Sequence, residues 1–413
     1  MRRVVVIGAG AAGTMAAIFA AGAGAETVLV ERTRDGGRKV LISGGGRCNV
    51  LPARLDEARF VSDSSPNTLR KIVRAWPLPE QVEFFQSALG IRLVEEPESG
   101  KLFPASNRAA DVRDGLLALA ARKGARLLMN TRVTDIVSAG DGWRVACDGS
   151  APLEADAVVV ATGGLSVPNT GSDGAGLRLL QRLGHEVHAT YPALTPITTD
   201  PAPFAALAGV SLTVTLSARA HGRSAQATGG FLFTHRGYSG PAVLDVSHVL
   251  VRSRAEGDQP PAQLVVRWTV HDEAGWQPLL QPRGSRTVLG VLRAEVPDRL
   301  AAVLLERARL DAARSLAALT RAERRRLLDA LVRCELPWTG DEGYKKAEVT
   351  GGGVSLAEVD PRTMESRRHH GLFLCGEVLD AFGPIGGYNF FWAWTTGRAA
   401  GQAAAAGSRS RMT

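Results

Sequence analysis

The first 31 residues constrain the fold more than any other part of the chain. Residues 4–7 form a β-branched run typical of a strand that is buried on both faces. Gly8, Gly10 and Gly13 follow at the spacing G-x-G-x-x-G, and an alanine-rich helical stretch leads to a second strand, "TVLVE", which ends at Glu31. This order predicts the strand–turn–helix–strand unit of a dinucleotide-binding fold.

Each of these glycines meets a separate requirement of that fold. Gly8 permits the tight turn, Gly10 lets the backbone approach a pyrophosphate, and Gly13 lets the helix pack closely on the strand. The free N–H groups at the start of the helix then face the phosphates. Glu31 is placed to accept hydrogen bonds from ribose hydroxyls.

The same residues have a competing interpretation as a secretory signal. Two arginines precede an apolar run and the small-residue sequence "AGAGA". A signal peptide requires neither the glycine spacing nor a strand that ends in Glu31 directly afterwards. We therefore expect a nucleotide site in a cytoplasmic protein. Beyond this stretch, no apolar run approaches the ~20 residues needed to span a bilayer.

Further glycine-rich segments favour FAD over NAD. In residues 35–50, three glycines between Ser43 and Arg47 expose backbone amides beside a cation, which suits a pyrophosphate or the polar edge of a flavin ring. The alternative for this segment is a merely flexible turn. In residues 155–185, a buried strand runs into "ATGG", which brings bare backbone close to a ligand.

The C-terminal segment has the same character. A strand is followed by Glu377 and Asp380, which are placed to bind ribityl or ribose hydroxyls. A helix from about Asn389 would stabilise negative charge at the N1–O2 edge of a reduced flavin. An ordinary closing strand and helix is the alternative. In residues 126–137, two short strands would carry the backbone of Val133 past the adenine.

Seven sequence motifs resemble those of one flavoprotein family. They are "VVVIGAGAAG", "SGGGRCN", "VVVATGG", "FTHRGYSGPAVLDVS", "EVTGGGVSLAEVD", "MESRRHHGLFLCGEVLDAFGPIGGYN" and "AWTTG". The family is the YhiN-type flavoproteins, also called aminoacetone oxidase-like FAD-binding enzymes or BaiN-type NAD(P)/FAD-dependent oxidoreductases. The resemblance covers nearly the whole chain, and "SGGGRCN" with "GGYN" is its most specific part. It implies tightly bound FAD in a glutathione-reductase-like α/β Rossmann domain that an insert domain interrupts.

One departure from the family pattern is the aromatic bulk of "FGPIGGYNFFWAWTTG". From it we expect a narrower apolar pocket, lined by aromatic residues of this segment. They are Phe382, Phe390, Phe391, Trp392 and Trp394. The substrates of better-known relatives therefore cannot simply be assigned to this protein, because its pocket would differ in size.

The motifs and the resemblance together define one set of residues that we expect to bind the cofactor. They are Gly8, Gly10, Ala11, Ala12, Gly13, Glu31, Arg32, Lys39, Ser43, Gly44, Gly45, Gly46, Arg47, Cys48, Asn49, Val133, Thr162, Gly163, Gly164, Gly376, Glu377, Asp380, Gly386, Gly387, Tyr388, Asn389 and Phe390. For Cys48, a small loop residue is favoured over a redox thiol or a covalent flavin link. No residue is assigned a catalytic role. The four cysteines form no CxxC pair, so no metal site is expected.

From about residue 192 the alternation of strands and helices stops. The predicted domains are an FAD domain in two parts, 1–191 and 344–413, and an insert, 192–343. Short strand-like runs broken by Gly and Pro predict antiparallel strands over 192–284. A helical pattern follows over 285–336, with a capping box at "TRAE".

The segment "FTHRGYSGPAVL" is the most distinctive part of the insert. His235, Arg236 and Tyr238 within it are candidates for a substrate entrance or for proton movement. A single histidine at a strand end is more often structural, so we do not assign these residues to catalysis.

The predicted activity is that of an FAD-dependent oxidoreductase acting on a small molecule through flavin N5. Only one complete dinucleotide fingerprint is present, so NAD(P)H would act as a transient donor at the flavin face rather than occupy a second domain. An oxidase of an amine-type substrate and an NAD(P)H-dependent reductase of an unsaturated carbonyl compound both remain open.

Two other functional classes are alternatives. The net charge of +8 suits a flavin-dependent RNA-modifying enzyme, and a non-catalytic flavin-binding redox regulator would carry the same motifs. The densest basic run, "ERRRLL", lies in an amphipathic helical pattern with acidic neighbours, which favours a solvated helix face over a nucleic acid site. We expect a small-molecule substrate and no membrane partner, and the sequence leaves the oligomeric state open.

Overall fold

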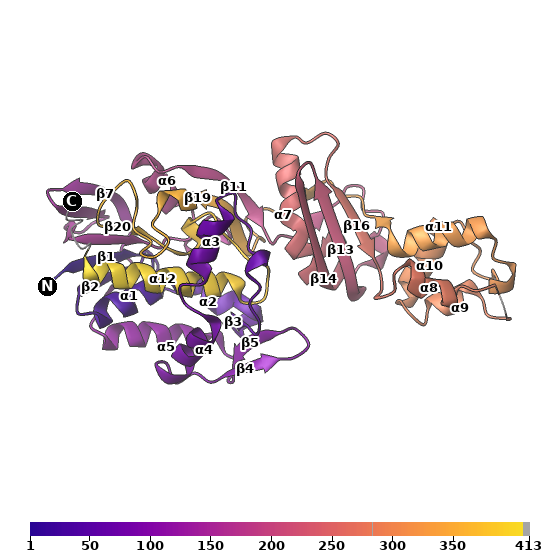
Figure 1. Ribbon diagram of the computed structural model, residues 1–413, viewed down its shortest axis with the longest axis horizontal. Coiled ribbons are helices and arrows are strands. Elements are labelled where there is room, and N and C mark those ends of the chain that lie inside the picture. Colours follow the sequence, from indigo (N-terminus) through magenta and orange to yellow (C-terminus); the bar gives the residue numbers. More distant parts are fainter. Residues whose placement is uncertain (283, 408–413) are drawn as a thin grey trace. The chain divides into compact units, whose positions relative to one another are not determined.

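The computed structural model describes residues 1–282 and 284–407, which belong to two compact units (Figure 1). The first unit is discontinuous and combines Met1–Thr190 with Val349–Thr413, while the second is Tyr191–Glu348. Within the described residues, no helix is both long and apolar enough to cross a membrane.

A five-stranded parallel sheet forms the centre of the first unit. Its strand order is β20 (Leu372–Leu374), β10 (Ala157–Val160), β1 (Arg3–Ile7), β2 (Glu26–Val30) and β6 (Arg126–Leu128). Every neighbouring pair is parallel. Val4, Val5 and Val6 are buried, because a central parallel strand is covered on both faces. The α/β fold predicted from the opening residues is confirmed.

The helices α1 (Ala11–Gly22) and α12 (Tyr388–Ala406) lie side by side (Figure 1). Their backbones are in contact: a Cβ atom added to Gly397 would lie 2.3 Å from the carbonyl oxygen of Ala12, and one on Gly401 would lie 2.2 Å from that of Ala16. The helix α5 (Ala109–Arg122) packs on α1 as well. The predicted start of α12 differs from the observed start by one residue.

Smaller elements complete the first unit. Its minor sheets are β3 (Leu51–Pro52), β5 (Lys101–Pro104) and β4 (Leu93–Glu96); β7 (Val133–Ala139), β8 (Gly142–Cys147) and β9 (Leu153–Ala155); and the pair β11 (Val187–Ala193) and β19 (Val349–Val354). Its other helices are α2 (Arg38–Ile42), α3 (Pro66–Val73), α4 (Leu78–Ser87) and α6 (Ala175–Arg182).

The second unit contains an antiparallel sheet, as predicted. Its order is β17 (Cys334–Glu335), β16 (Gln263–Arg267), β13 (Ser211–Ala220), β14 (Arg223–Thr234), β15 (Gly237–Ser239), β12 (Ile197–Thr198) and β18 (Gly340–Asp341). The helical part consists of α8 (Glu273–Leu279), α9 (Val288–Leu292), α10 (Asp298–Arg307) and α11 (Arg321–Val332). The predicted capping box is present, because Thr320 and Glu323 bond each other's backbone N–H groups at the start of α11.

One long helix of the second unit was not predicted. The helix α7 (Pro241–Glu256) packs on β13 and β14 within the stretch expected to be β-rich. Its valines, such as Val243, Val246 and Val249, favour a strand by composition, yet they are buried at helical spacing. Pro241, which occupies the first turn, was the overlooked signal of a helix start.

We predict that the contact between α1 and α12 is intolerant of a single methyl group. Gly401→Ala should lower the free energy of unfolding by about 2 kcal/mol, because the added carbon overlaps the backbone of α1. Gly22→Ala is the matched control in α1, since an added Cβ atom there meets only the Lys123 side chain at 3.7 Å. Chemical denaturation of both variants tests this, and equal loss in the two would contradict it.

Candidate cofactor site

The turn between β1 and α1 has room for a phosphate group. A Cβ atom on Gly13 would lie 1.8 Å from the carbonyl oxygen of Gly8, so helix and turn touch through their backbones. A Cβ atom on Gly10 would meet nothing within 4 Å. The first turn of α1 has no side-chain cap and no acidic residue. Its free N–H groups and the open space fit a pyrophosphate.

Glu31 is held at the end of β2 next to this turn. One carboxylate oxygen accepts a hydrogen bond from the Ala9 N–H (2.8 Å), and the other accepts from the N–H and hydroxyl of Thr33 (2.8 Å each). The segment from Leu128 to Val133 runs alongside, because the Glu31 N–H donates to the Leu128 carbonyl. The predicted ribose ligand and the predicted adenine contact at Val133 are therefore brought to one edge of the sheet.

The glycines after Ser43 form an exposed turn that follows α2. Gly44 and Gly45 adopt left-handed conformations (φ 56° and 67°), and Gly44, Gly45 and Gly46 are exposed. The Arg47 guanidinium donates to Glu96 (2.9 Å) and lies 4.1 Å from the centre of the Phe103 ring. Its charge therefore anchors the turn to β4 and β5. We keep only its backbone as a predicted cofactor contact.

Cys48 does not have the environment of a redox thiol. Its side chain is buried, and burial raises the pKa of the thiol to about 12, although a hydrogen bond with Ser43 opposes this shift. A thiol held in its neutral form is a poor nucleophile. The structure therefore favours Cys48 as a small residue of the loop over Cys48 as a redox-active thiol or as the site of a covalent flavin link. Within the described chain, no group of three or more His, Cys, Asp or Glu residues is arranged to hold a metal.

A partly buried ion pair joins three distant segments of the first unit. The Lys39 ammonium lies 2.7 Å from Glu377 and 2.6 Å from the Ser166 hydroxyl, which itself donates to Glu377 (2.7 Å). The Thr350 N–H also donates to Glu377 (2.9 Å). A Cβ atom on Gly164 would lie only 2.3 Å from the Thr350 hydroxyl oxygen, so a larger residue at position 164 would collide with Thr350. The structure thus brings together Lys39 and Glu377, which the sequence predicts as cofactor ligands.

Asp380 takes a different position from the one expected. Its buried carboxylate accepts hydrogen bonds from Ser62, Asp63 and Ser64 and lies 3.2 Å from Nδ1 of His188. Burial raises the pKa of Asp380, and His188 and Ser62 partly offset this effect. The structure therefore does not support Asp380 as a ligand of ribityl hydroxyls. Its partners lie on the segment before α3 and on β11, which no sequence pattern linked to it.

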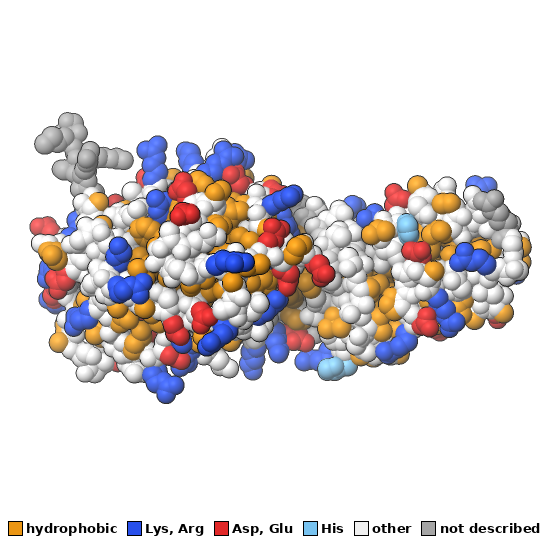
Figure 2. Space-filling view, turned by 90° about the horizontal axis from the view of Figure 1, so that it is seen from below, with side chains coloured by type: hydrophobic (Ala, Val, Ile, Leu, Met, Phe, Trp, Pro, Cys, Tyr) orange, Lys and Arg blue, Asp and Glu red, His pale blue; other side chains and the backbone are white. Residues whose placement is uncertain are grey.

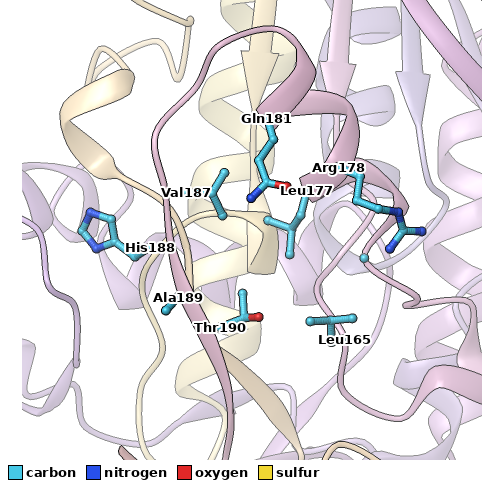
Figure 3. A pocket seen from close by; sticks show the side chains of 9 residues that line it. Leu165, Leu177, Arg178, Gln181, Val187, His188, Ala189 and Thr190 are labelled. Atoms are coloured by element: carbon cyan, nitrogen blue, oxygen red, sulfur yellow. The ribbon is translucent and has the colours of Figure 1, made fainter. Parts of the chain in front are cut away.

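A cavity of about 300 Å³ lies beside His188, between α6 and β11 (Figure 3). Leu177 and Gln181 of α6 and Val187 of β11 line it. The imidazole of His188 lies on the other side of β11 from Leu177 and Gln181 in Figure 3, as its contact with Asp380 requires. None of the predicted cofactor ligands lines this cavity.

The start of α12 presents backbone rather than side chains. Gly387 precedes it with φ 90°, and the helix has no side-chain cap and no acidic residue in its first turn. Tyr388 is buried and bonds through its hydroxyl to the N–H of Asp56 (3.2 Å). The Asn389 amide bonds both backbone groups of Gly383. The side chains of Tyr388 and Asn389 thus shape the turn, so that the predicted cofactor contact of these residues would come from their backbone.

The aromatic residues of this segment mostly belong to the core. Phe382, Phe391, Trp392 and Trp394 are buried, while Phe390 is half-buried and stacks on Trp394 (5.3 Å between ring centres). The Trp392 and Trp394 N–H groups donate to backbone carbonyls. The expected narrowing of an apolar pocket by these rings is not supported, because most of them pack inside the core of the first unit.

Three other predicted cofactor ligands make their contacts within the first unit through different groups. The Thr162 side chain points at α6, where a Cβ atom on Gly176 would lie 1.8 Å from its hydroxyl oxygen, so only the Thr162 backbone faces Gly8. The Arg32 guanidinium pairs with Asp173 (2.5 Å). A Cβ atom on Gly376 would lie 2.7 Å from the Ala12 side chain, which places the Gly376 turn against α1.

The distinctive segment of the second unit divides into exposed and structural residues. His235 and Arg236 are exposed at the turn between β14 and β15. Tyr238 is buried, and its hydroxyl donates to the Pro337 carbonyl (3.1 Å). Tyr238 therefore serves the core of this unit and is not a substrate-entrance residue.

We predict that Gly10→Ala leaves the fold intact but weakens FAD binding at least tenfold. The methyl group meets no protein atom within 4 Å, yet it occupies the space expected for the phosphates. The flavin-to-protein ratio after gel filtration and the melting temperature measure the two effects. Gly22→Ala is the control, and an unchanged flavin ratio in Gly10→Ala would contradict the predicted phosphate position.

The Lys39–Glu377 pair should make stability depend on pH. Burial alone would raise the pKa of Glu377, but Lys39, Ser166 and Thr350 lower it below its ordinary value. The pair therefore stabilises the fold fully above the ordinary glutamate pKa of about 4.3, and this contribution is lost as the pH falls through the lower folded value.

We expect Glu377→Gln to melt well below the parent protein at neutral pH, with the difference shrinking below about pH 4. Glu83→Gln, at an exposed position of α4, is the control. Melting temperatures across this pH range provide the measurement. A difference that is independent of pH would show that the pair does not carry the stability.

Comparisons with known proteins agree with this fold. The family model described as "HI0933-like protein Rossmann domain" matches residues 2–403. The 3-dehydro-bile acid delta(4,6)-reductase of Clostridium scindens is 32% identical over 98% of this chain and 99% of that protein. The ribosomal RNA dihydrouridine synthase of Escherichia coli is 29% identical over 96% of this chain and 96% of that protein. The enzyme of the same name from Haemophilus influenzae is 30% identical over 95% of this chain and 96% of that protein.

Among solved structures, the 3-ketosteroid delta1-dehydrogenase of Sterolibacterium denitrificans shares the fold. It matches with a TM-score of 0.54 and 14% identity over 98% of this chain and all of that one. The resemblance stated from the motifs is confirmed by the family model, which spans nearly the whole chain. The chain belongs to the HI0933-like Rossmann family of flavin-dependent oxidoreductases.

Proposed function

We propose that the protein is an FAD-dependent reductase of a carbon–carbon double bond conjugated to a carbonyl group. One observation carries this proposal: two relatives with very different substrates are named for the same bond change. The delta(4,6) double bonds of a 3-dehydro bile acid are conjugated to its 3-oxo group. Dihydrouridine is uridine with its C5–C6 bond saturated, and that bond is conjugated to the C4 carbonyl.

The chain's own residues would bind and orient the cofactor for this reaction. Bound FAD would supply two electrons as a hydride from its N5 position. The N–H groups at the start of α1 would hold the pyrophosphate, and Glu31 the ribose hydroxyls. The Lys39–Glu377 pair and the N-terminus of α12 would hold polar groups of the ribityl chain and the flavin ring. These assignments account for the segments that the first unit brings together.

NAD(P)H is the proposed source of the electrons. The chain has one complete dinucleotide turn, so this donor would reach the flavin face and leave before the substrate enters. The opposite direction, oxidation of an amine-type substrate, lacks support from the relatives' names. We place the reaction in the cytoplasm, since Cys48, Cys147, Cys334 and Cys375 are free thiols.

An anaerobic titration tests the proposal. NADPH or NADH should bleach the visible absorbance of the bound flavin, and a 3-oxo-Δ4 steroid or cyclohexenone should restore it. The corresponding saturated ketone is the control and should leave the flavin reduced. The proposal fails if the unsaturated ketones and free uridine all leave the flavin reduced, or if an amine reduces the flavin whereas NAD(P)H does not.

Modification of RNA is the second candidate. Two relatives are named ribosomal RNA dihydrouridine synthases, and the net charge is +8. On the face shown in Figure 2, Lys and Arg side chains lie among Asp and Glu side chains, so that face shows no continuous basic area. The small-molecule substrate therefore stays the first choice.

A single assay separates the two substrates. The reduced enzyme is incubated with a ribosomal RNA transcript, and nucleosides are analysed for uridine that has gained two hydrogen atoms. RNA as the substrate predicts this gain and a binding constant that falls steeply with salt. If the uridines of the transcript gain no hydrogen atoms while the steroid enone is reduced, the substrate is a small molecule and not RNA.

A further inference from the structure

A lysine that no motif includes lies beside the turn before α12. Lys101 begins β5 and pairs with Pro52 of β3. A Cβ atom on Gly386 would lie 3.8 Å from Cε and 3.9 Å from Cγ of Lys101. A Cβ atom on Gly387 would lie 2.3 Å from the carbonyl carbon of Leu51, the residue before Pro52. Both strands thus pack on the turn, and the Lys101 side chain runs along it.

The Lys101 charge is not neutralised by a direct contact. Lys101 is half-buried and forms no ion pair within residues 1–282 and 284–407. Its cross-strand neighbour is Glu96, whose carboxylate accepts hydrogen bonds from Ser99 (2.6 Å) and Arg47 (2.9 Å). Ser99 first, and then Arg47, lower the pKa of Glu96, and the Lys101 charge adds to this effect. Glu96 thus has Ser99 and Arg47 as its direct partners, and Lys101 acts on it only through its charge.

The turn itself already favours negative charge. Gly386 and Gly387 have φ values of 113° and 90°, and the 19-residue helix behind them has no acidic residue in its first turn. The backbone of Gly383 is tied to Asn389, which holds the loop against the helix start. The uncapped start of α12 and the Lys101 side chain therefore lie at the same turn, where the N1–O2 edge of the flavin ring is expected.

We propose that Lys101 stabilises the negative charge that develops on the N1–O2 edge of the flavin ring when it is reduced, and so raises the reduction potential of the cofactor. This inference rests on the FAD site of the proposed function and deepens it. A donor such as NAD(P)H can load the flavin more completely when that potential is higher. Lys101 acts on the cofactor's electrostatics and is not assigned a proton-transfer role.

The midpoint potential of the bound flavin tests this inference. We expect Lys101→Met to favour the oxidised flavin at least tenfold, which lowers the potential by about 30 mV for a two-electron couple. Lys101→Glu should lower it further, and Lys101→Arg should keep it near the parent value. Lys71→Met, at an exposed position of α3, is the control that removes a charge elsewhere.

The outcomes separate this inference from the proposed function. Potentials that are equal in the parent, Lys101→Met and Lys101→Glu proteins would overturn the role of Lys101, even if the enzyme reduces conjugated double bonds. A protein that takes up no flavin would instead overturn the cofactor site and the proposed function. An equal drop in Lys71→Met would show that the overall charge of the protein, and not the position of Lys101, sets the potential.

Discussion

The structure of the first unit depends on backbone-to-backbone packing around α1. The N-terminal turn of this helix touches Gly8 through Gly13 and touches α12 at Gly397, and one turn later, at Ala16, it touches α12 again at Gly401. Each contact leaves no room for a Cβ atom. Because the helices and the turn are this close, the N–H groups that begin α1 are aimed at one fixed point. A looser arrangement would leave the phosphate position undefined.

The polar part of the site is assembled from segments that are far apart in the sequence. Lys39 and Glu377 are separated by 338 positions, and the ion pair between them is completed by Ser166 and the backbone of Thr350. A partly buried pair of this kind is sensitive to the loss of either partner, since the remaining charge would lack its compensation. The discontinuous first unit brings these segments together, because the chain leaves it at Thr190 and returns at Val349.

Several site residues could not be predicted because their partners are defined only in three dimensions. Ser166 and His188 lie outside the seven motifs, and Thr350 lies within one that gave no sign of its contact with Glu377; these contacts follow from the way β11 and β19 pair beside the central sheet. Tyr388 and Asn389 lie within a recognisable motif, but their side chains turn into the protein. A motif indicates that a position is constrained without indicating whether its backbone or its side chain meets the requirement.

The sequence by itself determined the parallel sheet, the dinucleotide turn and the acidic end of β2, because these depend on local steric rules about glycine, β-branched residues and helix starts. It also determined the family, through motifs spread along the chain. Only the tertiary structure decided that Asp380 faces His188, that the aromatic residues of α12 serve the core, and that Lys101 reaches Gly386. Side-chain direction at these positions depends on packing between elements that are distant in sequence, and no local pattern encodes such packing.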